Sequence, residues 1–322
     1  MKTMQWLVRR ELWEHQGMLL RAPLVVAILM ALFVGVMLLS GHNMVFSFNG
    51  QQATLTEAIN GAYLSDVRKS ALLAMMAGSY MAASAPIFLM LGFLVFFYCL
   101  SALHDERMDR SLLFWKSLPV SDSSTVLSKA LVALVVAPAI AIAIGTALSL
   151  LLLLMLCIAL ALKGLNLFPA LLSMPALYLT PLRVVALLPI YVLWALPTVG
   201  WLLMVSSWAR SKVFLWAVGA PLLSGAFALW ADKAYELGWN GAWFMQDIVA
   251  RVLLGATPGA WLLFDQQQRA DLMGQAQQQF DLAGIVSHSW MMLGSANLWL
   301  GVLAGCAMMG AAIRLRRWRE EV

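Results

Sequence analysis

Long apolar runs without charged residues recur along the whole chain. Six of them reach about 18 residues or more, the length at which a helix can cross a bilayer; they are 23–40, 81–103, 130–162, 184–206, 213–231 and 296–313. The pattern predicts an all-α integral membrane protein with six transmembrane helices and both termini on one side. The third run would measure about 50 Å as a helix against a hydrocarbon core of about 30 Å. It must therefore tilt, kink at Pro138 or project beyond the bilayer.

The N-terminal stretch 1–21 is more polar than these runs. Trp6 and Trp13 stand seven residues apart, on nearly one face of a helix, and basic residues accompany them. This combination is typical of a helix that lies along the membrane surface. We expect an interfacial elbow helix, which either also contacts a partner or serves only as an anchor.

The segments 41–79 and 163–183 face the side opposite the termini. The first contains Thr54-x-x-Glu57, the pattern of a capping box, which predicts a helix over 58–76. The second holds three prolines among aliphatic residues. We expect it to be an irregular segment at the membrane interface.

The outer loop 232–295 is the longest connection and has an apolar part, 243–264. Gly255-Ala-Thr-Pro258-Gly259 interrupts that part and breaks it into two short helices. One interpretation is a re-entrant hairpin whose outer gate contains Gly255, Pro258, Gly259 and Trp261. The other is a pair of interfacial helices, and the sequence does not separate the two.

Composition agrees with a membrane protein. The chain is 62% hydrophobic and 11% charged, whereas a soluble domain has about 25% charged residues. The net charge of +5 comes from basic residues dispersed over the connecting segments, so it indicates membrane topology and no nucleic-acid partner. Of the 21 Lys and Arg residues, 14 fall on the side of the termini, which is therefore expected to be cytoplasmic.

The sequence offers little catalytic chemistry. No Asp, Glu, Lys, Arg or His lies inside the six runs, although ion-coupled carriers usually keep such groups near the membrane midplane. The chain has no His-Glu-x-x-His, Gly-x-Ser-x-Gly, Cys-x-x-Cys or phosphate-binding Gly-x-x-x-x-Gly-Lys motif, and its histidines and cysteines are scattered. We predict no catalytic or metal site, so the energy for any transport must come from outside these helices.

The segment 104–128 separates the second and third runs and is rich in charge. Glu106 and Arg110 are four residues apart with the acid first, which favours a short helix ending before Pro119. That helix would expose Phe114 and Trp115 as a docking surface for another protein. Ser121, Asp122 and Ser123 provide N-cap oxygens for a following helix that starts near Thr125. The alternative is a solvated connector whose charges only set topology.

These parts resemble the ABC-2 type family of ABC transporter permeases. The residues that carry the resemblance are Arg10-Glu11-Leu12, Glu106-Arg107, Ser117-Leu118-Pro119-Val120-Ser121 and Lys129. In that family a Glu-Arg, Ser-x-Pro and Lys run lies between spans two and three and forms a coupling helix that docks on a separate ATPase. Met108-Asp109-Arg110-Ser111 departs from the pattern, since family members often have a glycine soon after the Glu-Arg pair.

The resemblance implies that 1–322 is a single transmembrane domain of an exporter in the bacterial cytoplasmic (inner) membrane. The working unit would contain two permeases, identical or homologous, and two cytosolic ATPase subunits that bind ATP and Mg. The contacts with the ATPase would come from Glu106, Arg107, Arg110, Phe114, Trp115 and Lys116. An uncharged pore suits an amphipathic or hydrophobic substrate such as a drug, a peptide or a lipid-linked molecule.

Other interpretations remain. Gly301-x-x-x-Gly305 permits close helix approach, either within the chain or at a dimer seam. A scaffold or sensor subunit would recruit a partner through 104–128 without translocating anything. An intramembrane enzyme acting on lipid would use polar residues of the outer loop, such as Asp265, Asp281 and His288, as acid or base.

Overall fold

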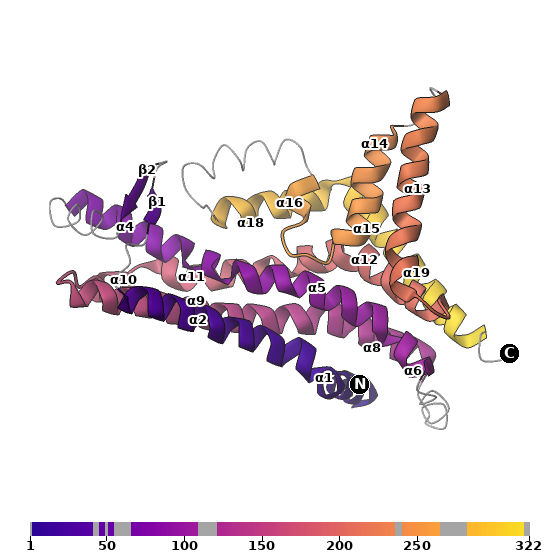
Figure 1. Cartoon of the computed structure of the whole chain (residues 1–322), viewed down its shortest axis with the longest axis horizontal. Coiled ribbons are helices and arrows are strands. Elements are labelled where there is room, and N and C mark those ends of the chain that lie inside the picture. Colours follow the sequence, from indigo (N-terminus) through magenta and orange to yellow (C-terminus); the bar gives the residue numbers. More distant parts are fainter. Residues whose placement is uncertain are drawn as a thin grey trace.

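The computed structural model describes residues 2–40, 45–48, 51–54, 66–108, 121–235, 240–264 and 282–318. Within these ranges, six helices are long and apolar enough to cross a membrane. They are Gly17–Leu39, Leu72–Met108, Asp122–Leu162, Pro175–Trp208, Val213–Tyr235 and Ala296–Trp318. The prediction of a helical, multi-pass membrane protein with six spans is therefore confirmed (Figure 1).

The first half of the chain contains the N-terminal helix, a short β-hairpin and the first three spans. Its elements are α1 (Lys2–Glu14), the π-helical turn η1 (Gly17–Arg21), α2 (Ala22–Leu39), β1 (Val45–Phe48), β2 (Gln51–Thr54), α4 (Asp66–Ser79), the 3-10 turn η2 (Tyr80–Ser84), α5 (Ala85–Ala102), α6 (His104–Met108), α8 (Asp122–Leu131), the π-helical turn η3 (Val132–Val136) and α9 (Ala137–Leu162).

The second half contains the last three spans and several short helices between them. Its elements are α10 (Phe168–Leu172), α11 (Pro175–Ala186), α12 (Leu188–Trp208), α13 (Val213–Tyr235), α14 (Gly241–Trp243), the π-helical turn η4 (Phe244–Ala250), α15 (Arg251–Leu254), α16 (Trp261–Phe264), α18 (Leu282–Met291), the 3-10 turn η5 (Met292–Gly294) and α19 (Ala296–Trp318).

Three of the long helices change their hydrogen-bond pattern just before a proline. η1 precedes Pro23, η2 precedes Pro86 and η3 precedes Pro138. Because proline has no N–H, a carbonyl one turn earlier loses its α-helical donor and the backbone adjusts to a wider or tighter turn. The helix with Pro138 nevertheless has a total length of 41 residues. At about 60 Å it projects well beyond a hydrocarbon core of about 30 Å.

From Pro175 onward the segment 163–183 is helical, although its prolines suggested an irregular stretch throughout. α11 begins at Pro175 and the fourth membrane helix runs from there to Trp208. Proline in the first turn of a helix loses no hydrogen bond. Pro181 lies inside the helix, as membrane helices tolerate when neighbouring groups satisfy the freed backbone.

The helix predicted over 58–76 is described only from Asp66 onward. Thr54 ends β2, where it pairs with Val45 across the antiparallel hairpin. The next described helix, α4, starts at Asp66. Residues 58–65 of the predicted helix lie outside the described residues.

Two hydrophobic clusters form the interior. The larger one centres on α12, whose buried face packs against α5, η3 and α19. The smaller one joins α4, η2, α10 and α11 with the C-terminal part of α9. Large apolar side chains also cover the outward surfaces of α2 and α13, where Phe33, Leu223 and Phe227 are mostly exposed. Such surfaces are rare on soluble proteins and suit contact with lipid.

Candidate functional site

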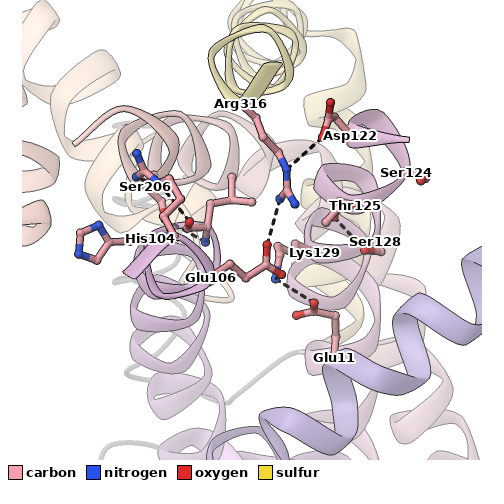
Figure 2. A network of polar contacts seen from close by, with 12 residues as sticks. Glu11, His104, Glu106, Asp122, Ser124, Thr125, Ser128, Lys129, Ser206 and Arg316 are labelled. Atoms are coloured by element: carbon pink, nitrogen blue, oxygen red, sulfur yellow. Dashed lines mark hydrogen bonds and ion pairs between the residues drawn. The ribbon is translucent and has the colours of Figure 1, made fainter. Parts of the chain in front are cut away.

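A buried carboxylate, Glu106, occupies the centre of a cluster of charged side chains at the end of α5 (Figure 2). Its side chain is 7% exposed and contacts three cations. Lys129 Nζ lies 3.0 Å from Oε1, Arg10 Nη2 lies 3.4 Å from Oε1, and Arg316 Nη1 lies 3.0 Å from Oε2. These cations come from α8, α1 and α19, so one carboxylate joins three other helices to α6.

A second buried carboxylate, Glu11 on α1, shares the same lysine. Lys129 Nζ donates to Glu11 Oε1 at 2.8 Å, and the Tyr98 hydroxyl of α5 donates to Oε2 at 3.0 Å. The side chain of Lys129 is 1% exposed. A buried ion is tolerated only when it is paired and hydrogen-bonded, and Lys129 meets this condition through the two carboxylates.

The start of α8 adds a further ion pair to the cluster. Arg316 Nε lies 3.3 Å from Asp122 Oδ1, in the first turn of α8, where a carboxylate also interacts favourably with the helix dipole. Ser121 caps the same turn by accepting from the Ser124 N–H at 3.2 Å. The predicted N-cap is confirmed, although the helix starts at Asp122 and not near Thr125.

We call Arg10, Glu11, Tyr98, Glu106, Asp122, Lys129 and Arg316 the Glu106 cluster. It connects α1, α5, α6, α8 and α19. α6 and α8 flank residues 109–120 on either side. Both α6 and α8 are thus joined by ion pairs to the N-terminal helix and to the last span.

Arg107 makes a separate connection to the end of α12. Its guanidinium donates to the carbonyl oxygens of Ser206 and Ala209, the latter at 3.1 Å. The Ser206 hydroxyl accepts from the backbone N–H groups of Leu103 and His104 at 3.1 and 3.0 Å. The last carbonyls of a helix have no partner within it, so these bonds satisfy the end of α12 and fix it to α6.

The sequence-predicted coupling residues have different positions. Glu106 and Arg107 are engaged inside the chain, an arrangement that favours positioning of the segment over direct contact with a partner. Arg110, Phe114, Trp115 and Lys116 lie outside the described residues. Tyr98, Asp122 and Arg316 were not predicted to belong to such a cluster, while Glu11 and Lys129 stood in the family-like motifs without an assigned role.

The second candidate region is the hairpin, residues 240–264, which comprises α14, η4, α15, the turn after it and α16. α14 and η4 lie beside α13. In Figure 1 they project together with α13 away from the other long helices. A Cβ on Gly241 would approach the Ala228 carbonyl oxygen to 3.0 Å, and one on Gly225 would approach Val249 to 3.0 Å. Gly225 and Gly241 therefore allow α13 to pack closely against α14 and η4.

The turn of the hairpin reaches the middle of two spans. A Cβ on Gly92 of α5 would lie 3.1 Å from Thr257 Cβ, and one on Gly255 would lie 2.6 Å from Thr198 Oγ1 of α12. The Tyr191 hydroxyl of α12 donates to the Ala256 carbonyl at 3.0 Å. The hairpin therefore contacts α5 and α12 through small groups at close range.

The predicted gate residues all belong to this turn or follow it. Gly255 is buried against α12, and Gly259 has φ +81°, a conformation that glycine adopts without strain. Pro258 stands between them in the turn. Trp261 is 2% exposed and donates from Nε1 to Ser289 Oγ of α18 at 2.8 Å. Of the four residues, Gly255 and Trp261 are thus buried, while Pro258 and Gly259 are partly exposed.

Arg251 is a buried cation of the hairpin that sequence analysis did not single out. Its guanidinium carbon lies 4.1 Å from the centre of the Trp194 ring, Nη1 donates to the Asn297 carbonyl at 2.6 Å, and Nη2 donates to the Leu298 carbonyl at 3.4 Å. Burial lowers the pKa of Arg251 to about 10, while Asp247 acts in the opposite direction. The side chain therefore remains protonated at neutral pH.

Both glycines of Gly301-x-x-x-Gly305 pack inside the chain. A Cβ on Gly301 would collide with the Arg251 guanidinium, and one on Gly305 would approach the Leu196 carbonyl oxygen of α12 to 2.8 Å. Gly200 of α12 faces the Gly305 carbonyl oxygen at 2.6 Å from its ideal Cβ. These contacts agree with the within-chain interpretation of the motif.

An apolar groove of about 710 Å³ runs between α2 and α9. Its lining includes Leu24, Ala31, Gly35, Leu148 and Met155. Its walls belong to two membrane-spanning helices and match the chemistry of acyl chains and other hydrophobic molecules. Within the described ranges, no three His, Cys, Asp or Glu side chains are grouped as a metal site would require.

Compared with protein-family models, with curated proteins and with solved structures, the chain gives no match.

Proposed function

We propose that the chain is the permease subunit of an ATP-driven exporter of the ABC-2 type. The observation that carries this proposal is the Glu106 cluster, which joins α6 and α8, the helices on either side of 109–120, to α1 and α19. Arg107 in addition joins α6 to α12. We infer that a displacement of α6 or α8 is passed on to the spans to which these contacts join them. This is the mechanical requirement for a coupling element driven by a partner.

The orientation follows from charge. The termini and the Glu106 cluster lie at one end of the helices, because Arg10 of α1 and Arg316 of α19 both contact Glu106. That end also carries most of the Lys and Arg residues, so it faces the cytoplasm. The membrane is the bacterial cytoplasmic membrane, and α1 lies on its inner surface with Trp6 and Trp13 exposed toward lipid.

The energy comes from a separate cytosolic ATPase, because this sequence has no phosphate-binding loop. Two ATPase subunits with ATP and Mg dock on two permease chains, either identical or homologous. The docking surface includes Phe114 and Trp115, and Glu106 and Arg107 hold the segment that presents it.

The hairpin acts as a re-entrant outer gate. Its turn contacts residues near the middle of α5 and α12, and this depth supports re-entry over an interfacial position. The groove along α2 and α9 and the apolar walls of the spans support an amphipathic or hydrophobic substrate.

The test is to solubilise the protein from its native membrane in mild detergent and identify the soluble proteins that co-purify. Wild type should retain a nucleotide-binding protein in roughly equal amount, and Phe114→Ala/Trp115→Ala should lose it. Trp318→Ala is the matched control. It removes an exposed aromatic side chain at the C-terminal end of α19, two residues after Arg316 of the Glu106 cluster.

The two parts of the proposal fail separately in this experiment. If no nucleotide-binding protein co-purifies with wild type under several mild conditions, the permease assignment is wrong. If the ATPase is retained by the double variant, the docking surface lies elsewhere. A partner that binds without any substrate-dependent turnover would instead indicate a scaffold or sensor subunit.

A further inference from the structure

Arg251 joins three elements that would have to separate if the hairpin moved. It belongs to α15, its guanidinium covers the Trp194 ring of α12, and it donates to the Asn297 and Leu298 carbonyls at the start of α19. Its own carbonyl oxygen accepts from Thr198 Oγ1 of α12 at 2.7 Å. One residue therefore carries the main polar contacts between the hairpin and these two spans.

The guanidinium occupies a notch on α19 that only glycine leaves open. A Cβ on Gly301 would collide with the carbon and both terminal nitrogens of the Arg251 guanidinium. By contrast, a Cβ on Gly310 of the same helix would meet nothing within 4 Å. The guanidinium of Arg251 can therefore occupy this position only because residue 301 has no side chain.

The contacts of this guanidinium are of a kind that can be released. Its two hydrogen bonds go to neutral carbonyls and its third contact is with an aromatic face. The carboxylate that interacts with it electrostatically, Asp247, belongs to the hairpin itself and is only partly buried, so it moves with Arg251 when the hairpin withdraws. Among the described residues, no partner hydrogen-bonds to Arg251 Nε. Two carbonyls and an aromatic ring therefore hold the Arg251 guanidinium less firmly than two carboxylates hold Lys129.

The backbone on both sides of Arg251 suits movement. The π-helical turn η4 precedes it, and the turn with Gly255 and Gly259 follows within eight residues. π-Helical turns often mark functional sites, and glycine absorbs changes in backbone angles at a hinge. Within the turn, Thr257 faces α5 at Gly92, which has no side chain to obstruct it.

We propose that Arg251 is the latch of the hairpin: its guanidinium, seated between Trp194 and Gly301, holds the hairpin against α12 and α19, and the hairpin opens when the guanidinium leaves this notch. The inference rests on the proposed function, since it gives the outer gate its closing residue. Arg251 is a positioning residue and is assigned no contact with substrate.

The test measures how fast a cysteine at Thr257 reacts with a water-soluble maleimide in lipid nanodiscs. Cys306 is exposed and is replaced by alanine, while Cys99 and Cys157 are buried and their background labelling is measured in the parent. In the parent, Thr257→Cys should react slowly, because the side chain faces Gly92. Arg251→Gln and Gly301→Ala should each raise the rate about tenfold by favouring local opening.

Two controls give the result its meaning. Gly310→Ala adds the same methyl group to α19 at an open position and should leave the rate unchanged. A disulfide between Ser84→Cys and Gly145→Cys, whose Cβ positions lie 3.0 Å apart, reports whether η2 and α9 still pack correctly. It should form equally well in all variants.

The latch proposal is overturned if Arg251→Gln and Gly301→Ala label no faster than the parent. It is also overturned if both variants lose the Ser84–Gly145 cross-link, because Arg251 would then support the whole bundle. The assay needs neither an ATPase nor a transported molecule. A missing ATPase in the co-purification experiment therefore rejects the proposed function without deciding the latch, and a failed labelling test rejects the latch alone.

Discussion

At the scale of single residues, Lys129 carries the greatest share of the charge balance in the Glu106 cluster. It is buried and serves both Glu11 and Glu106. Lys129→Met leaves two buried carboxylates short of a cation, which should destabilise the protein by about 3 to 5 kcal/mol. Thermal unfolding in detergent measures the effect. Lys233→Met, which removes an exposed lysine, should change the midpoint little, and equal losses for both variants would contradict the assignment.

The residue pairs of this cluster could not be predicted from the sequence. Lys129 and Glu11 are 118 residues apart, and Arg316 and Glu106 are 210 apart. A charged residue at the edge of an apolar run is equally compatible with a solvated end and with a buried ion pair. Periodicity indicates which helix face a residue occupies but not which distant helix lies opposite. The charged residues of the motif could therefore be recognised in the sequence, whereas the side chains that they contact could not.

At the scale of elements, Arg316 joins α19 to α6 and α8, the two helices that flank residues 109–120. It contacts Glu106 of α6 and Asp122 of α8. Arg316→Met should therefore loosen α8 and raise amide hydrogen exchange in residues 121–131 by about tenfold. Arg317→Met removes the exposed neighbouring arginine and should leave that exchange near the wild-type rate. Unchanged exchange in Arg316→Met would show that α8 is held without this ion pair.

The elements themselves were largely predictable, but their ends were not. Each of the six predicted spans corresponds to a membrane-length helix, because about 20 apolar residues leave few alternatives. The helices extend further than the apolar runs, as with Pro175–Trp208 against the expected 184–206. The prolines of 163–183 were given too much weight as helix breakers: Pro175 begins a helix, and Pro181 lies inside it.

At the scale of the whole molecule, α12 links the two candidate regions. Ser206 near its C-terminal end holds α5 and α6, while Trp194 and Thr198 hold the hairpin. Twelve residues separate Trp194 from Ser206, or about 18 Å along a helix. α12 also packs along α19 through Gly200 and Gly305. One closely packed helix pair, α12 and α19, thus connects α6 with the hairpin.

This linkage predicts that locking the hairpin affects the ATPase at the other end. Gly92→Cys and Thr257→Cys place Cβ atoms about 3.1 Å apart, near the separation of about 3.5 to 4.5 Å that a disulfide requires. In a complex with the proposed ATPase, oxidation should lower ATP hydrolysis by at least about fivefold, and a reductant should restore it. The Ser84→Cys/Gly145→Cys disulfide joins η2 to α9 away from the hairpin and should leave hydrolysis unchanged. Full hydrolysis with the hairpin locked would mean that no energetic coupling passes along α12.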